Sequence, residues 1–199
     1  SGGYDGDAAV STFDRPTGVA SDKYGNIYVV DAANNKIRKI TPSGLVSSFA
    51  GGDYYQYGHT DGQGASARFF QPLAIASDTA GNIYVTDNGN SLVRKITPDG
   101  TVTTILGPYE PAITGSGDLF RSTVLATDKY GNLYFAISVG IVKRSPDGTI
   151  TRYACGGIGE TDGPAASVAT WRYIAGIAVD DAGTLFVTDN NRVRKVAWQ

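Results

Sequence analysis

The chain has 199 residues, of which 41% are hydrophobic and 18% charged, and its formal net charge is −2. This length and apolar content predict a folded protein with a sizeable core, and the charge balance excludes a general attraction to nucleic acid or anionic membranes. One cysteine and one histidine exclude a disulfide framework and a zinc site built from Cys and His. No apolar run approaches the roughly 20 residues that span a bilayer.

Four copies of one unit follow each other along the chain. The first, GVASDKYGNIYVVDAANNKIRKITPSGLVSSFAG, begins at Gly18, and its counterparts begin at Leu73, Val124 and Gly176. Equivalent aspartates are 56, 50 and 52 residues apart: Asp22, Asp78, Asp128 and Asp180. A period near 50 residues predicts a repeat architecture. We place the repeats at about 5–52, 61–107, 111–157 and 162–199 of a single domain.

Each unit contains four short segments with β-strand character. The first is small and apolar, and a turn that ends in glycine leads into the second, NIYVV in the first unit, which is rich in β-branched and aromatic residues. The third, KIRKI, is followed by a turn that starts with proline and by the fourth, LVSSFA. Four antiparallel strands at this period are typical of a β-propeller blade, whose innermost strand lines a crowded axis and must be small.

The combination of PTGVASDKYGNIYVVD, NNKIRKI and PSGLVS resembles the NHL repeat, and the resemblance covers essentially the whole chain. It implies an all-β propeller that is commonly six-bladed and serves in most members as an interaction platform. It also implies a bacterial protein that is secreted or on the cell surface. Some related propellers are enzymes, which rely on several histidines, on a catalytic histidine, or on carboxylates around a metal.

The fourth unit stops at VRKVAWQ, with no residues left for a fourth strand. We therefore expect the last blade to lack its outer strand and the chain to be an open portion of a larger propeller. A four-bladed ring and closure by another chain are the alternatives. An open edge favours pairing with a further strand, so self-association through this edge is also expected.

Two sets of aspartates recur in the units. The first set, Asp22, Asp78, Asp128 and Asp180, could form a ring that holds calcium through its oxygens. Each member also precedes a turn, where its side chain can accept backbone N–H bonds, and we predict this turn role and no cofactor. The second set, Asp31, Asp87 and Asp189, ends the second strand, and in the third unit Ala136 takes this place. Its loss from one unit favours a turn-bracing residue over shared catalytic machinery.

Basic pairs occupy every third strand: Arg38/Lys39, Arg94/Lys95, Lys143/Arg144 and Arg194/Lys195. Neighbouring residues of a strand point to opposite faces, which spreads this charge around the rim. We expect their stems to lie over apolar surface and predict no nucleic-acid partner. The single histidine, His59, falls in the polar segment YYQYGHTDG, so we expect it at the surface.

The stretch DGQGASARFFQP at residues 61–72 looks like a phosphate or metal loop. Its copies at Asp5 and Asp162 lack the second glycine and the arginine, which removes that interpretation. What recurs is a turn, a spacer of small residues and one large apolar residue. We predict that this residue packs between blades: Phe13, Phe69, Leu119 and Trp171.

The connections between units differ, and they concentrate aromatic residues. In a propeller they emerge on the face that also carries the loops after the second strands. We predict a protein- or glycan-binding face there, made of Tyr54, Tyr55, Tyr57, His59, Trp171 and Tyr173. The expected function is therefore a noncatalytic recognition or scaffold module. A metal-dependent lactonase- or lyase-like enzyme and, behind it, an RNA-binding domain are the alternatives.

Overall fold

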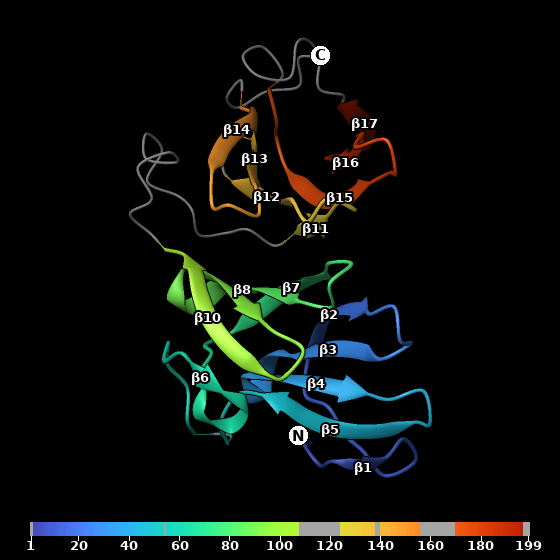
Figure 1. Cartoon of the computed structure of the whole chain (residues 1–199), viewed down its shortest axis with the longest axis vertical. Coiled ribbons are helices and arrows are strands. Elements are labelled where there is room, and N and C mark those ends of the chain that lie inside the picture. Colours follow the sequence, from blue (N-terminus) through green and yellow to red (C-terminus); the bar gives the residue numbers. More distant parts are fainter. Residues whose placement is uncertain (1, 54, 108–123, 138–139, 156–169, 197–199) are drawn as a thin grey trace. The chain divides into compact units, whose positions relative to one another are not determined.

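The computed structural model describes residues 2–53, 55–107, 124–137, 140–155 and 170–196 (Figure 1). The chain divides into two compact units, Ser1–Leu106 and Gly107–Gln199. We describe each unit by itself. The described residues of both units are almost entirely strands and turns, which confirms the all-β fold class.

The first unit contains two antiparallel sheets of five strands each. The first sheet runs, from one edge to the other, through β2 (Pro16–Ser21), β3 (Ile27–Asp31), β4 (Lys36–Ile40), β5 (Leu45–Ala50) and the short β1 (Gly6–Asp7). The second sheet repeats this order with β7 (Pro72–Ser77), β8 (Ile83–Asp87), β9 (Leu92–Ile96), β10 (Thr101–Leu106) and β6 (Gly62–Gln63). Three 3-10 turns complete the unit: η1 (Ala32–Asn34), η2 (Gly64–Ser66) and η3 (Asn88–Asn90).

The second unit contains the other two blades. The third sheet consists of β11 (Leu125–Thr127), β12 (Leu133–Ile137), β13 (Gly140–Arg144) and β14 (Ile150–Ala154). The fourth sheet consists of β15 (Ile174–Val179), β16 (Leu185–Asp189) and β17 (Arg192–Val196). Within the described residues the fourth sheet thus lacks an outer strand, as the sequence predicts.

The prediction of four strands per blade is wrong for the first two blades. The stretch before the inner strand, which the sequence presents as a turn and a spacer, adds a fifth strand to the outer edge of the same sheet. Gly6 pairs with Val46 of β5, and Gly62 pairs with Val102 of β10. Two-residue strands carry little periodicity, so their pairing depends on the rest of the sheet.

The registers between second and third strands identify equivalent positions. Arg38 lies opposite Val29, and Arg94 lies opposite Val85, whereas in the third blade Val142 lies opposite Phe135. The equivalent of Asp31 in the third blade is Ile137, which ends β12, so the assignment of Ala136 to this position is wrong.

Each unit buries its core between its two sheets. In the first unit Tyr28, Val30 and Ile37 of the first sheet join Ile83 and Val85 of the second. The core of the second unit repeats these positions with Tyr134 and Ile141 of the third sheet and Leu185, Val187 and Val196 of the fourth. Strands packed on both faces explain why the second strands read as continuous apolar runs.

The small inner strands are required by close approach. An added Cβ on Gly18 of β2 would lie 2.9 Å from the carbonyl oxygen of Leu73 on β7. Any larger side chain at this position would push the two inner strands apart. The glycine that ends the first hairpin turn, Gly25, has φ 80°, a conformation that favours glycine.

Candidate functional site

The aspartates after the first strands brace hairpin turns. Asp22 accepts hydrogen bonds from the backbone N–H groups of Tyr24 (2.9 Å) and Asn26 (3.0 Å), from the Asn26 amide (2.7 Å) and from the Tyr28 hydroxyl (3.1 Å). Partial burial acts against ionisation, but these bonds outweigh it and lower the pKa of Asp22. The Tyr28 hydroxyl holds its own proton more tightly in return, because burial and the Asp22 charge raise the pKa of Tyr28 to about 12.

Equivalent bonds recur in the other blades. Asp78 and Asp128 each accept from the asparagine and the tyrosine that follow them, whereas Asp180 accepts only backbone N–H bonds because Thr184 and Phe186 replace those side chains. Among the residues that the structure describes, no three His, Cys, Asp or Glu side chains are grouped as metal ligands would be.

Three arginines of the third strands lie inside the blades: Arg38, Arg94 and Arg194. Arg94 has no exposed surface, and its guanidinium contacts the carboxylates of Asp87 (2.9 Å) and Asp61 (2.8 Å). It also donates to the carbonyl oxygens of Arg68 (2.9 Å) and Thr60 (3.0 Å). Such a network fixes the chain segment before the inner strand onto its own blade, because a buried guanidinium needs all these partners.

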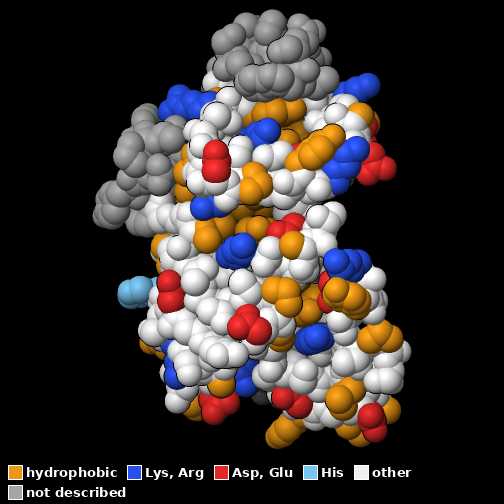
Figure 2. Space-filling view, in the orientation of Figure 1, with side chains coloured by type: hydrophobic (Ala, Val, Ile, Leu, Met, Phe, Trp, Pro, Cys, Tyr) orange, Lys and Arg blue, Asp and Glu red, His pale blue; other side chains and the backbone are white. Residues whose placement is uncertain are grey.

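The first and fourth blades repeat this arrangement. Arg38 contacts Asp5 (2.6 Å) and Asp31 (2.9 Å), and Arg194 contacts Asp189 (2.8 Å). The expectation that the stems lie over apolar surface is therefore wrong for Arg38, Arg94 and Arg194, which are buried whole. Lysines such as Lys39 are the more exposed members of the pairs, and on the face shown in Figure 2 basic and acidic side chains are interspersed.

The third blade loses both partners of the buried ion pair together. Ile137 replaces the aspartate and Val142 replaces the arginine, and both are buried. The Asp-Gly of the preceding segment is missing from the same unit. A buried charge without its partner is costly, so losing the arginine and both aspartates together avoids the penalty that losing one of them alone would bring.

In the first, second and fourth blades the large apolar residue before the inner strand stacks on the buried arginine. The guanidinium carbon lies 5.0 Å from the ring centroid of Phe13, 5.1 Å from that of Phe69 and 4.2 Å from that of Trp171. Trp171 is 2% exposed and donates from Nε1 to the Ala154 carbonyl oxygen, so its place in a binding face is wrong. Leu119 lies outside the described residues.

The first unit presents two exposed tyrosines on residues 53–61, which we call the tyrosine loop. Tyr55 is 86% exposed and Tyr57 62% exposed, and the ring of Tyr57 stacks on Phe70 at 5.1 Å. His59 is exposed as well, and the chain's one histidine stands out at the surface in Figure 2. Tyr54 lies outside the described residues.

The backbone of the tyrosine loop is held by the blade beneath it. Gly58 donates to the Phe69 carbonyl and accepts from the Asn90 amide (2.5 Å). Thr60 accepts from both Arg68 and Arg94. The loop backbone is therefore held at Gly58 and Thr60, directly after Tyr57.

In the second unit the sixth member of the predicted face, Tyr173, is 64% exposed. Its backbone N–H donates to Asp189 (2.8 Å), which also pairs with Arg194. The ion-pair network thus positions this tyrosine at the end of β16.

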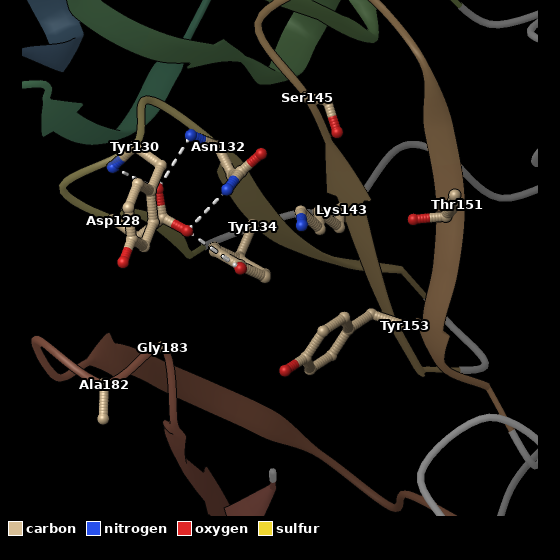
Figure 3. A pocket seen from close by; sticks show the side chains of 10 residues that line it. All are labelled: Asp128, Tyr130, Asn132, Tyr134, Lys143, Ser145, Thr151, Tyr153, Ala182 and Gly183. Atoms are coloured by element: carbon tan, nitrogen blue, oxygen red, sulfur yellow. Dashed lines mark hydrogen bonds between the residues drawn. The ribbon is translucent and has the colours of Figure 1, made fainter. Parts of the chain in front are cut away.

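A groove with a volume of about 410 Å³ lies at the opposite strand ends of the second unit (Figure 3). Its wall consists of hairpin turns and of polar side chains from the third blade, with the turn at Ala182 and Gly183 of the fourth blade facing them. The sequence does not single out this groove, because its members lie on three strands and three turns. Among the residues that line the groove, Tyr153 differs from its counterpart in the first blade, Phe49.

Comparison with known proteins agrees with the repeat and the fold. Residues 13–40 and 69–96 match the NHL repeat. Over 96 residues, or 48% of its length, the chain is 34% identical to Protein SUPPRESSOR OF QUENCHING 1, chloroplastic, of Arabidopsis thaliana, and it spans 9% of that protein.

Two solved structures resemble nearly the whole chain. An auxiliary nutrient binding protein from Bacteroides ovatus has a TM-score of 0.66 and 18% identity, over 94% of this chain and 49% of that one. A streptogramin B lyase has a TM-score of 0.62 and 20% identity, over 96% of this chain and 57% of that one. At these identities the likeness shows a common fold, which is shared by a binding protein and an enzyme.

Proposed function

Because the chain carries NHL repeats on propeller blades, we propose that it is a noncatalytic recognition or scaffold module that binds a protein or a glycan through the tyrosine loop. The observation that carries this proposal is the pair of exposed rings, Tyr55 and Tyr57, on a backbone fixed by Gly58 and Thr60. A fixed loop loses little conformational entropy on binding, and exposed tyrosines supply contact area together with a hydrogen-bonding hydroxyl. The binding protein with the same fold supports this choice.

The carboxylates that an enzyme would use are engaged in the fold. Asp22, Asp78 and Asp128 hold turns, and Asp31 and Asp87 hold buried arginines. We therefore place a metal-dependent lactonase- or lyase-like activity second. Its support is the shared fold with a lyase.

We also propose that the protein is bacterial and acts outside the cell or on its surface. None of the described helices is long and apolar enough to cross a membrane.

Among the described residues the outer edge of β17 pairs with no strand, and we propose that it supports self-association. Light scattering after gel filtration would show a mass above that of the monomer at rising concentration, and a constant monomer mass would contradict this part.

The recognition proposal is tested by screening the full chain against a glycan array and a displayed peptide library. We expect saturable binding that the double substitution Tyr55→Ala/Tyr57→Ala weakens by about tenfold or more. The matched control is Tyr24→Ala, because Tyr24 is also exposed but lies on a hairpin turn at the other strand ends. Binding that survives the double substitution would contradict the choice of the tyrosine loop.

The enzyme alternative is tested separately by metal analysis and by a panel of lactones and esters. Bound metal in stoichiometric amount together with turnover would favour the enzyme and overturn the noncatalytic assignment. Metal without turnover would indicate a structural ion, such as calcium, at the turn aspartates.

A further inference from the structure

Lys143 lines the groove of the second unit, and its counterpart in the first blade, Lys39, contacts two aromatic rings. Lys39 lies over the rings of Tyr28 and Phe49, with Nζ at 5.7 and 5.8 Å from their centroids. The equivalent Lys143 lies opposite Tyr134 and Thr151 in the sheet and lines the groove. Among the described residues neither an ion pair nor a cation–π contact joins Lys143, which distinguishes it from Lys39.

The side chains around Lys143 offer hydroxyl groups and aromatic rings. Tyr153 packs edge-on against Tyr134, with ring centroids 5.3 Å apart, in the same geometry as Phe49 on Tyr28. The third blade thus adds a hydroxyl where the first has only a ring, and Figure 3 shows this hydroxyl directed into the groove. Ser145 and Thr151 contribute two further hydroxyls, and the exposed ring of Tyr130 lies at the rim.

The carboxylate in the wall is already occupied by donors. Asp128 accepts from the backbone N–H groups of Tyr130 and Asn132, from the Asn132 amide and from the Tyr134 hydroxyl. Four donors disperse its negative charge, which leaves Lys143 as the charged group open to the groove. The second cation, Lys129, lies over the Tyr130 ring at the rim, at 5.2 Å.

We propose that this groove binds a small acidic sugar, with the carboxylate on Lys143 and the ring hydroxyls on Tyr153, Ser145 and Thr151. Its volume of about 410 Å³ lies within the roughly 300–1,000 Å³ of small-molecule sites. The hydroxyl groups of the groove match a hydroxylated ring, and the ammonium selects the carboxylate over a neutral sugar. The site goes beyond the proposed function, because none of its residues belongs to the tyrosine loop.

The test is a titration of the isotope-labelled full chain with sodium glucuronate and sodium galacturonate, followed by amide NMR shifts. Glucose and galactose are the neutral counterparts. We expect saturable shifts at Ser145, Thr151 and Gly183 with an acidic sugar, and binding at least about tenfold weaker for the neutral ones.

Two variants and two controls define the site. Lys143→Met should weaken binding by about tenfold or more, and Tyr153→Phe, which installs the first-blade residue, by roughly threefold to tenfold. Lys39→Met, the matched change in the first blade, and the Tyr55→Ala/Tyr57→Ala double variant should both leave the affinity within about twofold. The second control separates failure of this site from failure of the tyrosine loop.

Three results would overturn the proposal. The first is unchanged affinity in a folded Lys143→Met variant, and the second is equal affinity for the neutral sugars. The third is the absence of saturable shifts up to about 10 mM acidic sugar, where even a ligand with a Kd of about 1 mM would fill most sites.

Discussion

The second blade has a buried ion pair, Asp87 and Arg94, where the third blade has an apolar pair, Ile137 and Val142. Arg94→Val would leave the fully buried Asp87 carboxylate without its cation, and we predict a loss of about 3–5 kcal/mol in the free energy of unfolding. Asp87→Ile would leave the guanidinium with Asp61 and two carbonyl oxygens, so we expect the lower end of that range, about 3 kcal/mol.

The double substitution Asp87→Ile/Arg94→Val installs the residues that the third blade holds at 137 and 142. Burial raises the pKa of Asp87 despite the bonds from Phe70, Asn90 and Arg94 that lower it, which indicates that desolvation of the carboxylate opposes the pair. An apolar pair avoids this desolvation. We therefore predict that the double variant loses about 2–3 kcal/mol less than the sum of the single variants.

Hydrogen exchange measured by mass spectrometry on peptides from β8 to β10 is a suitable assay, because the two units need not unfold together. A loss of 3 kcal/mol corresponds to roughly 100-fold faster exchange, since about 1.4 kcal/mol is a factor of ten. Peptides from β12 and β13 serve as the control and should not change. Additive single costs, or a cost below about 1 kcal/mol for Arg94→Val, would refute this account of the network.

Packing and ionisation lead to four further predictions. Trp171→Ala should lower the free energy of unfolding by about 3–5 kcal/mol in thermal denaturation, whereas the exposed Tyr173→Ala should stay within about 0.5 kcal/mol; equal effects would contradict the assigned burial. Gly18→Ala should cost about 1–3 kcal/mol in urea unfolding, because its Cβ meets the Leu73 carbonyl, and a neutral result would mean that the inner strands can separate freely. The pKa values of Asp22 and Asp61 are lowered in the folded chain, since hydrogen bonds outweigh burial, so their stabilisation is complete well above pH 3.8 and is lost as pH falls through their folded values. The pKa of Tyr28 is raised to about 12, so its contribution to stability is present below pH 10 and declines between pH 10 and 12. Unfolding followed by circular dichroism in the acidic and the alkaline range should show stability falling toward both ends. A stability that rises toward either end would contradict these assignments.

Most of the fold could be predicted from local patterns. The turn glycines and the β-branched runs predict the strands of each blade, because strand and turn preferences depend on residues close together in the sequence. The period near 50 residues then shows that the blade is repeated. The apolar residue before each inner strand could be found in the same way, and the burial of Phe69 and Trp171 agrees with it. The short β1 and β6 could not be found, since their pairing depends on an outer strand some 40 residues away.

The candidate sites were less accessible to sequence. Local spacing shows Asp61, Asp87 and Arg94 as members of three unrelated motifs, and Arg94 as a surface residue of a basic pair. Chain folding brings both carboxylates within 3 Å of the Arg94 guanidinium inside one blade. Trp171 was grouped with exposed aromatics because composition does not report the direction in which a side chain points.

The sequence by itself determines that this protein is a set of repeated blades, because backbone propensity and the alternation of side chains are local properties. Only the tertiary structure decides which polar residues are engaged and which are open to a partner. Arg94 and Lys143 both stand on third strands, yet one is enclosed by two carboxylates and the other lines a groove. The difference is set by residues from other strands and turns, because their distances to a charge decide whether it is paired within the fold.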